Sequence, residues 1–360
     1  MSAATRASRR RPKVLSVIGA RPEIIQASRV SAALASIADE VLVHTGQHYD
    51  LSMSELQIVS TQLPNPDYNL EVGSRPDAEQ LAIGEERLSA LIERERPNAV
   101  VVRGDTNGTL SGARAAAAAG VTLVHVEAGL RSFREEMPEE RNRVETDHLS
   151  DLLFPPTERA AARLRSEGVK GTIHVTGDPL CDMLESLRDE IRPASGDYVL
   201  ATVHRDYNTS DPDRLGAVLE CLGRSPWPVV FPVHPRTASC ISSWGLDLPT
   251  QVRVSEPVSY RRMLELERGA RAIATDSGGV QREAYLWGVP CITLREETEW
   301  METVEAGWNV LVGVDADAFA EALRRQIPAE RPAFFGDGHA AERIAGLTVE
   351  YVLDKLEEAA

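Results

Sequence analysis

The sequence predicts an α/β protein built from two doubly wound Rossmann-like domains. Short, continuous runs of apolar residues alternate with helix-like segments, which is typical of parallel strands that helices bury on both faces. The alternation stops near residues 180–197, where Pro193 and Gly196 break regular structure, and then it restarts. Two successive arrays in a chain of 360 residues indicate two domains of ordinary size.

The first array predicts an N-terminal domain over residues 14–180. Pro22 follows the first apolar run, where it suits the first turn of a helix. Residues 1–13 are basic and precede an apolar run too short for a signal peptide, so we expect them to form a flexible tail. Strands of this domain are expected at 14–18, 41–45, 99–103, 122–126, 152–154 and 174–176.

The second array predicts a C-terminal domain over residues 198–338, joined to the first by a linker at 181–197. Residues 339–360 read as a helix after the last strand, and we expect this helix to pack back on the N-terminal domain. Strands of the second domain are expected at 198–203, 229–233, 252–254, 272–274, 291–294 and 310–312.

Composition excludes several classes of protein. The net charge of −16 argues against nucleic acid or an anionic membrane surface as a partner, and no apolar run approaches transmembrane length. The four cysteines are scattered without a CxxC pair, which is typical of reduced thiols in a cytoplasmic protein. The histidines lack metal-ligand spacing, and neither GxGxxG, GxSxG nor a Walker A loop occurs, so we expect no metal and no nicotinamide cofactor.

A Ser-Gly-Gly turn at residues 277–279 is the first candidate binding site. It follows the apolar run 272–274 and precedes a predicted helix, whose free N–H groups and positive dipole end suit a phosphate. Glu283 lies about one helical turn further on, so its carboxylate could reach a ribose diol at the same place. Ser277, Gly278, Gly279 and Glu283 could therefore bind a nucleotide, although an ordinary strand-to-helix turn would look alike.

Acidic residues at strand ends form a second candidate site. Asp105 and Glu127 each follow an apolar strand, and Glu139 shares a helix face with Arg143 and Asp147. Asp105 could also be a helix cap, and the helix could be an ion-paired surface helix. Carboxylates that share a cleft can act as proton donor and acceptor near neutral pH.

Three further polar residues lie at strand ends. Arg21 follows the first strand, where a guanidinium group could bind phosphate oxygens. His204 ends the first strand of the second domain, and His234 occupies the matching place one strand later. Ligands of doubly wound sheets bind outside the carboxyl ends of the strands, which predicts that these clusters line one cleft between the domains.

As a set, the motifs resemble those of the non-hydrolysing UDP-N-acetylglucosamine 2-epimerases. They occur in family order from about residue 14 to residue 313. The matching segments are Gly19–Glu23, Thr45–His48, Gly104–Thr106, His125–Arg131, Pro138–Glu140 with Asn142 and Arg143, His204–Arg205, and Asp276–Gly279 with Gln281 and Glu283.

The resemblance implies a glycosyltransferase-B-like fold with an interdomain cleft, a homodimer, a UDP-sugar substrate and a reaction without a cofactor. It implies that UDP leaves a 2-acetamidoglucal and adds back after C2 is reprotonated on the other face. Its implied catalytic residues are Asp105, Glu127, Glu139, Arg143 and His204. Its implied UDP ligands are Arg21, His204, Ser277, Gly278, Gly279 and Glu283. A second sugar-nucleotide site would involve Gln47, His48 and His234.

The sequence departs from the family pattern at several positions. Ala20 replaces the usual Thr, Gln26 stands where many members carry Lys, and the segment after His204 is one residue longer. Other stretches resemble a branch that epimerises UDP-2,3-diacetamido-2,3-dideoxyglucuronate at C2. A glycosyltransferase of the same fold and a non-catalytic sugar-nucleotide sensor are the alternatives, and the acids Asp105, Glu127 and Glu139 favour the epimerase.

Overall fold

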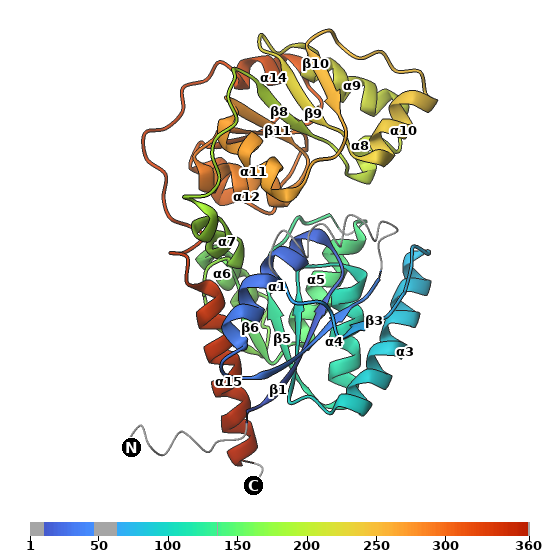
Figure 1. Ribbon diagram of the computed structural model, residues 1–360, viewed down its shortest axis with the longest axis vertical. Helices are drawn as coiled ribbons and strands as arrows, with labels where there is room; N and C mark the ends of the chain where they lie inside the picture. Colours follow the sequence, from blue (N-terminus) through green and yellow to red (C-terminus); the bar gives the residue numbers. More distant parts are fainter. Residues whose placement is uncertain (1–10, 47–62, 135, 359–360) are drawn as a thin grey trace. The chain divides into compact units, whose positions relative to one another are not determined.

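The computed structural model describes residues 11–46, 63–134 and 136–358 of the chain. These residues form two compact units, whose elements are labelled in Figure 1. The first unit comprises the chain up to Glu185 together with the segment from Phe334 onward, and the second comprises Ser186–Ala333. Each unit contains a parallel sheet with alternating helices, which confirms the predicted α/β class.

The first unit is organised around a parallel sheet of seven strands within the described residues. The strand order β3-β2-β1-β4-β5-β6-β7 reverses direction between β1 and β4, as in a doubly wound fold. The strands are β1 (Lys13–Ile18), β2 (Asp39–His44), β3 (Tyr68–Asn69), β4 (Ala99–Arg103), β5 (Thr122–Val126), β6 (Leu152–Phe154) and β7 (Thr172–Ile173).

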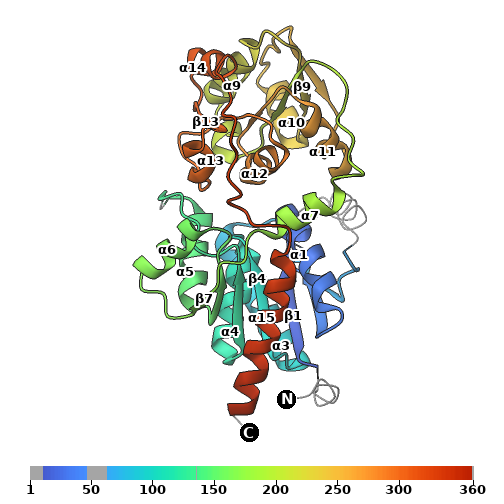
Figure 2. The same cartoon turned by 90° about the vertical axis from the view of Figure 1, so that its left-hand side faces the viewer.

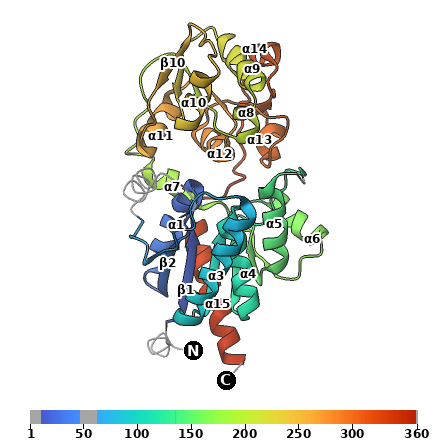
Figure 3. The ribbon, with the colours of Figure 1, turned by 90° about the vertical axis from the view of Figure 1, so that its right-hand side faces the viewer.

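Helices cover both faces of this sheet, because neighbouring residues of each strand point to opposite sides. Val101 packs with α1 (Arg21–Leu34) and α15 (Ala340–Glu358), whereas Val100 and Val102 pack with α3 (Asp77–Glu95) and α4 (Asn107–Ala119). Figure 2 shows α15 along one side of the sheet, and Figure 3 shows α3 and α4 from the opposite direction. Among the described residues, the other helices are α5 (Pro138–Leu149), α6 (Glu158–Ser166) and α7 (Pro179–Leu187), and α7 crosses from the first unit into the second after Glu185.

The second unit contains a parallel sheet of six strands in the order β10-β9-β8-β11-β12-β13. Its strands are β8 (Val199–Thr202), β9 (Val229–Pro232), β10 (Val252–Ser255), β11 (Ala272–Thr275), β12 (Cys291–Thr293) and β13 (Asn309–Leu311). One core cluster joins this sheet to α9 (Pro212–Gly223), α10 (Pro235–Ser243) and α14 (Ala316–Ala322). A second cluster joins it to α11 (Tyr260–Gly269) and α12 (Gly278–Trp287), and the short helices are α8 (Asp206–Thr209) and α13 (Met301–Glu305).

Two edge strands differ from the prediction. The strand expected at 174–176 is β7 at Thr172–Ile173, because its pairing with the three-residue strand β6 sets its position. Strand β3 was not predicted, since it has only two residues and is defined by pairing with β2 at Val43 and His44. In the part of the chain that the structure describes, no helix has the length and apolar character needed to span a bilayer.

Candidate functional site

The ends of β4 and β5 bring Asp105 and Glu127 to the same edge of the first sheet. Gly104 precedes Asp105 with a φ of 63°, and its N–H donates to the Val126 carbonyl over 3.1 Å. Glu127 has a φ of 69°, a left-handed conformation that costs a residue with a side chain about 1 kcal/mol or more. A residue keeps such a conformation only where the surrounding contacts stabilise it. The left-handed conformation therefore identifies Glu127 as a candidate functional residue.

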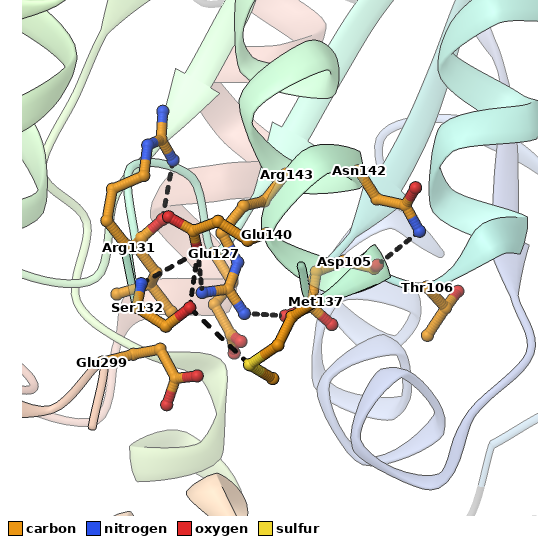
Figure 4. Close-up of polar contacts among 12 residues, drawn as sticks. Asp105, Thr106, Glu127, Arg131, Ser132, Met137, Glu140, Asn142, Arg143 and Glu299 are labelled. Carbon is orange, nitrogen blue, oxygen red and sulfur yellow. Dashed lines mark hydrogen bonds and ion pairs between the residues drawn. The ribbon is translucent and has the colours of Figure 1, made fainter. Parts of the chain in front are cut away.

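Arg143 joins Asp105 to a second carboxylate. This buried arginine of α5 forms an ion pair through Nη2 with Asp105 and a hydrogen bond through Nη1 with Glu140 over 3.0 Å (Figure 4). Glu140 also accepts hydrogen bonds from the Ser132 N–H over 2.8 Å and the Ser132 hydroxyl over 2.9 Å. Arg143 is thereby fixed against the loop that follows β5.

On α5, Arg143 pairs with a glutamate that was not among the predicted site residues. Glu139, which sequence analysis singled out, is half-buried in the first turn of α5, while the neighbouring Glu140 is the buried partner of Arg143. The spacing of three residues between Glu140 and Arg143 is the sequence signal that could have identified this pair.

Glu127 receives a hydrogen bond from an unexpected residue. The Gln26 side chain of α1 is 2% exposed, and its Nε2 donates to the Glu127 carboxylate. Within the described residues its Oε1 has no hydrogen-bond partner. Gln26, which stands where many family members carry Lys, therefore contacts a candidate catalytic acid.

Glu23 ties the loop after β1 to the loop after β4. Its carboxylate accepts hydrogen bonds from the N–H groups of Gly19 and Ala20 over 2.6 and 3.0 Å and from the Thr106 hydroxyl over 2.7 Å. Burial raises the pKa of Glu23 from 4.5 to about 7, although these hydrogen bonds oppose the rise. Glu23 was not among the predicted site residues. Its position in the first turn of α1 was the feature of the sequence that could have indicated a role at this site.

The remaining predicted residues of the first unit are Arg21, Gln47 and His48. Arg21 is the first residue of α1, directly after the loop that follows β1. Gln47 and His48, the predicted second-site residues, lie outside the described residues.

In the second unit, Asp276 organises the ends of β8 and β11. This fully buried carboxylate accepts hydrogen bonds from the N–H groups of His204 and Arg205 over 3.1 and 3.0 Å. The His204 side chain is 41% exposed, and its Nδ1 lies 3.5 Å from Asp276 Oδ1. The ring of His234, which caps α10, lies 6.3 Å from the ring of His204, so the structure brings these two predicted residues together.

The Ser-Gly-Gly turn begins α12 at the end of β11, as predicted. Ser277 caps the helix by accepting a hydrogen bond from the Val280 N–H over 3.5 Å. A side chain at Gly278 would place its Cβ 3.1 Å from the indole nitrogen of Trp300, whereas Gly279 has more room. Glu283 is buried on the same helix, and its Oε1 accepts a hydrogen bond from the Tyr260 hydroxyl over 2.8 Å.

Both candidate sites occupy the points where the strand order of a sheet reverses. Asp105 follows β4 beside β1, and Ser277 follows β11 beside β8. Proteins of the doubly wound α/β class bind nucleotides at these points. Among the described residues, no group of three His, Cys, Asp or Glu side chains could hold a metal ion.

Comparison with known proteins gives the family. Residues 32–348 match the family model described as UDP-N-acetylglucosamine 2-epimerase, and the chain belongs to this family. It is 42% identical to the UDP-2,3-diacetamido-2,3-dideoxy-D-glucuronate 2-epimerase of Pseudomonas aeruginosa over 92% of this chain and 98% of the relative. It is 38% identical to the UDP-N-acetylglucosamine 2-epimerase of Methanocaldococcus jannaschii over 92% of this chain and 97% of that protein.

The fold is also similar to solved structures. The Methanocaldococcus jannaschii UDP-GlcNAc 2-epimerase in complex with UDP-GlcNAc and UDP matches with a TM-score of 0.85 and 37% identity, covering 94% of this chain and 99% of that chain. The S. aureus MnaA–UDP structure matches with a TM-score of 0.83 and 28% identity, covering 95% of this chain and 97% of that chain.

Proposed function

We propose that the chain is an isomerase that converts UDP-GlcNAc to UDP-ManNAc by non-hydrolysing epimerisation at C2. The observation that carries this proposal is the placement of Asp105 and Glu127 at the ends of neighbouring strands, in a chain of the epimerase family. A transferase would not need several acids around one sugar carbon, so these carboxylates favour an epimerase over a glycosyltransferase or a sensor.

The proposed reaction has two balanced halves. A carboxylate takes the proton from C2 while the C1–O bond to UDP breaks, which gives a 2-acetamidoglucal and free UDP. UDP oxygen then adds back to C1 while a second acid delivers a proton to the other face of C2. Asp105, Glu127 and Glu139 are the proposed acids, and Arg143 pairs with Asp105 and fixes the position of its carboxylate.

UDP is proposed to bind in the second unit. The N-terminus of α12 at Ser277, Gly278 and Gly279 offers backbone N–H groups to the diphosphate. Glu283 would bind the ribose, with Tyr260 holding its carboxylate in place. His204 and Arg21 would stabilise the anionic leaving group as the C1–O bond breaks.

A second substrate has support of its own. The relative named as a UDP-2,3-diacetamido-2,3-dideoxy-D-glucuronate 2-epimerase is 42% identical to this chain. The same elimination and re-addition would operate on that sugar, because the chemistry involves only C1 and C2. We also propose a homodimer, as the family resemblance implied, and a cytoplasmic location, which suits four free cysteines.

The test is proton NMR of the protein with UDP-GlcNAc in heavy water, without added nicotinamide. We expect UDP-ManNAc to appear and deuterium to enter C2 of both sugars. Glu127→Gln should lose exchange while still binding UDP, and the exposed Glu350→Gln variant should behave as the wild type. Absence of exchange with UDP-GlcNAc would overturn this substrate, and absence with the diacetamido uronate as well would overturn the epimerase.

A further inference from the structure

His125 is a fully buried histidine whose two ring nitrogens both face hydrogen-bond acceptors. Nδ1 lies 2.8 Å from Asp147 Oδ1, and Nε2 lies 2.8 Å from the carbonyl oxygen of Gly104. A neutral imidazole carries only one N–H, so one of these contacts would then set a lone pair against an acceptor. Both contacts are favourable only when each nitrogen carries a proton.

We infer that His125 is held as an imidazolium ion and acts as a positioning residue for the two acids Asp105 and Glu127. This inference rests on the proposed function where it concerns turnover. The protonation of the ring can be tested without it. His125 is 0% exposed, so it acts through its neighbours and not by touching a substrate.

The charges around the ring favour this state. Besides His125, Asp147 of α5 accepts hydrogen bonds from the Gly129 N–H over 3.2 Å and from Arg131 Nη1 over 2.7 Å. Arg131 also pairs with Glu167, at the end of α6, over 2.6 Å. Arg131 is shared between the buried Asp147 and the partly exposed Glu167, so an imidazolium ring supplies a second positive charge beside the Asp147 carboxylate. A buried carboxylate is costly unless it is paired, which favours the charged ring.

The contacts of Asp147 with His125 and Arg131 also affect its pKa. Burial raises the pKa of a carboxyl group, but the contacts of Asp147 with His125 and Arg131 outweigh it and lower the pKa of Asp147 below its ordinary value. The N–H groups of Gly129 and Arg131 are also directed at Asp147, so its carboxylate is an acceptor and His125 Nδ1 is its third donor.

The second contact of the ring fixes the backbone that carries Asp105. Gly104 donates its N–H to Val126 over 3.1 Å and presents its carbonyl to His125 Nε2, so both sides of this residue are held by β5. The held carbonyl belongs to the peptide group that leads into Asp105. Glu127 lies two residues after His125, directly beyond the end of β5, and has a left-handed backbone conformation. One ring thus locks together the two strand ends that present the acids.

The first experiment measures ring protonation in the full chain. Nitrogen-15 NMR of histidine-labelled protein at pH 7.5 should show one histidine with both ring nitrogens protonated. That signal should vanish in His125→Asn and persist in His148→Asn, which alters an exposed histidine next to Asp147 on α5. An unprotonated ring nitrogen on His125 would overturn the inference, whether or not the protein proves to be an epimerase.

The second experiment separates the two contacts of the ring. In His125→Asn the amide can replace the Nδ1 donor to Asp147, and in His125→Gln it can replace the Nε2 donor to Gly104. We expect His125→Asn to lower kcat by about 10-fold or more with little change in KM, because small displacements of reacting groups are costly. His125→Gln should retain more of the wild-type kcat at a similar Tm.

The outcomes separate failure of the inference from failure of the proposed function. Equal kcat in both variants and the wild type, with only a lower Tm, would make His125 a purely structural residue. A wild-type protein that does not exchange the C2 proton would refute the proposed function, and the ring protonation would still decide the imidazolium assignment.

Discussion

At the scale of single residues, the first unit holds carboxylates in contrasting environments. Asp105 and Glu140 pair with Arg143, whereas Glu23 is buried among N–H and hydroxyl donors. Burial therefore raises the pKa of Glu23 to about 7, and this carboxyl group carries a proton over much of the mildly acidic range.

Glu23→Gln should reveal this proton as a change in stability with pH. The folded protein binds the proton more tightly than the unfolded chain, so the contribution of Glu23 to stability falls as pH rises from about 4.5 to about 7. Glutamine keeps the same shape and can donate to the Thr106 and Thr109 hydroxyls, but it cannot ionise. The stability of Glu23→Gln relative to the wild type should rise across this interval, by as much as about 3 kcal/mol.

Urea unfolding of both proteins at pH 4.5, 6 and 8 measures this difference. The exposed Glu350→Gln variant is the control, and its stability relative to the wild type should change little with pH. A difference between Glu23→Gln and the wild type that stays constant with pH would show that Glu23 ionises as readily in the folded protein as in the unfolded chain.

The predicted site residues and the contacts that were not predicted differ in how local their sequence signals are. Asp105, Glu127 and Ser277 follow apolar strands, so the rule for doubly wound sheets was sufficient to place them. The pairing of Glu140 with Arg143 was not predicted, and it is supported by Ser132, which reaches α5 from the preceding loop. The contact between Gln26 and Glu127 joins residues separated by 101 positions, and no local pattern encodes it.

At the scale of elements, the buried parallel strands were predictable and the edge strands were not. A central strand such as β4 has five buried residues in succession, so its sequence identifies it alone. Strands β3 and β7 each have two residues and exist through pairing with a neighbour. Their position is therefore set by tertiary contacts that short sequence windows do not contain.

The N-terminus of α15 depends on a distant carboxylate, and Asp182→Ala tests it. Asp182 is buried on α7, and it accepts hydrogen bonds from the N–H groups of Ala340 and Ala341 over 3.0 and 2.6 Å. Alanine would leave both donors unpaired, which should lower the free energy of unfolding of the first unit by about 1–3 kcal/mol.

Chemical denaturation with the exposed Asp354→Ala variant as control measures the cost of losing this cap. Asp354 lies on the same helix, and its replacement should change stability by less than about 0.5 kcal/mol. If the two alanine variants are equally stable, α15 does not depend on Asp182 for its first turn.

At the scale of the whole molecule, the chain leaves the first unit after Glu185, builds the second unit, and returns to the first at Phe334. The returning helix α15 supplies Ala341, Ile344, Ala345 and Val352 to the core that also contains Val14 and Val101. The first unit is therefore complete only with the last segment of the chain. The proposed UDP ligands at Ser277 and Glu283 belong entirely to the second unit.

This division predicts that the two units respond to different perturbations. Ile344→Asp places a charge at a position that is 1% exposed, which should destabilise the first unit by about 4 kcal/mol or more. Leu356→Asp makes the same change on the same helix at a position that is 46% exposed, and it should have little effect. UDP should instead stabilise the second unit by mass action.

Differential scanning calorimetry can distinguish these responses, because a chain of two units need not unfold in a single step. We expect Ile344→Asp to lower the temperature of one transition and UDP to raise the temperature of the other. Leu356→Asp should have transition temperatures close to those of the wild type. Ile344→Asp should also lose C2 proton exchange while UDP still raises the transition temperature of the second unit, since Asp105 and Glu127 lie in the first unit and Ser277 and Glu283 lie in the second. A single transition whose temperature shifts with both perturbations would mean that the two units unfold together. Calorimetry could then not show that the acids and the nucleotide site belong to units of independent stability.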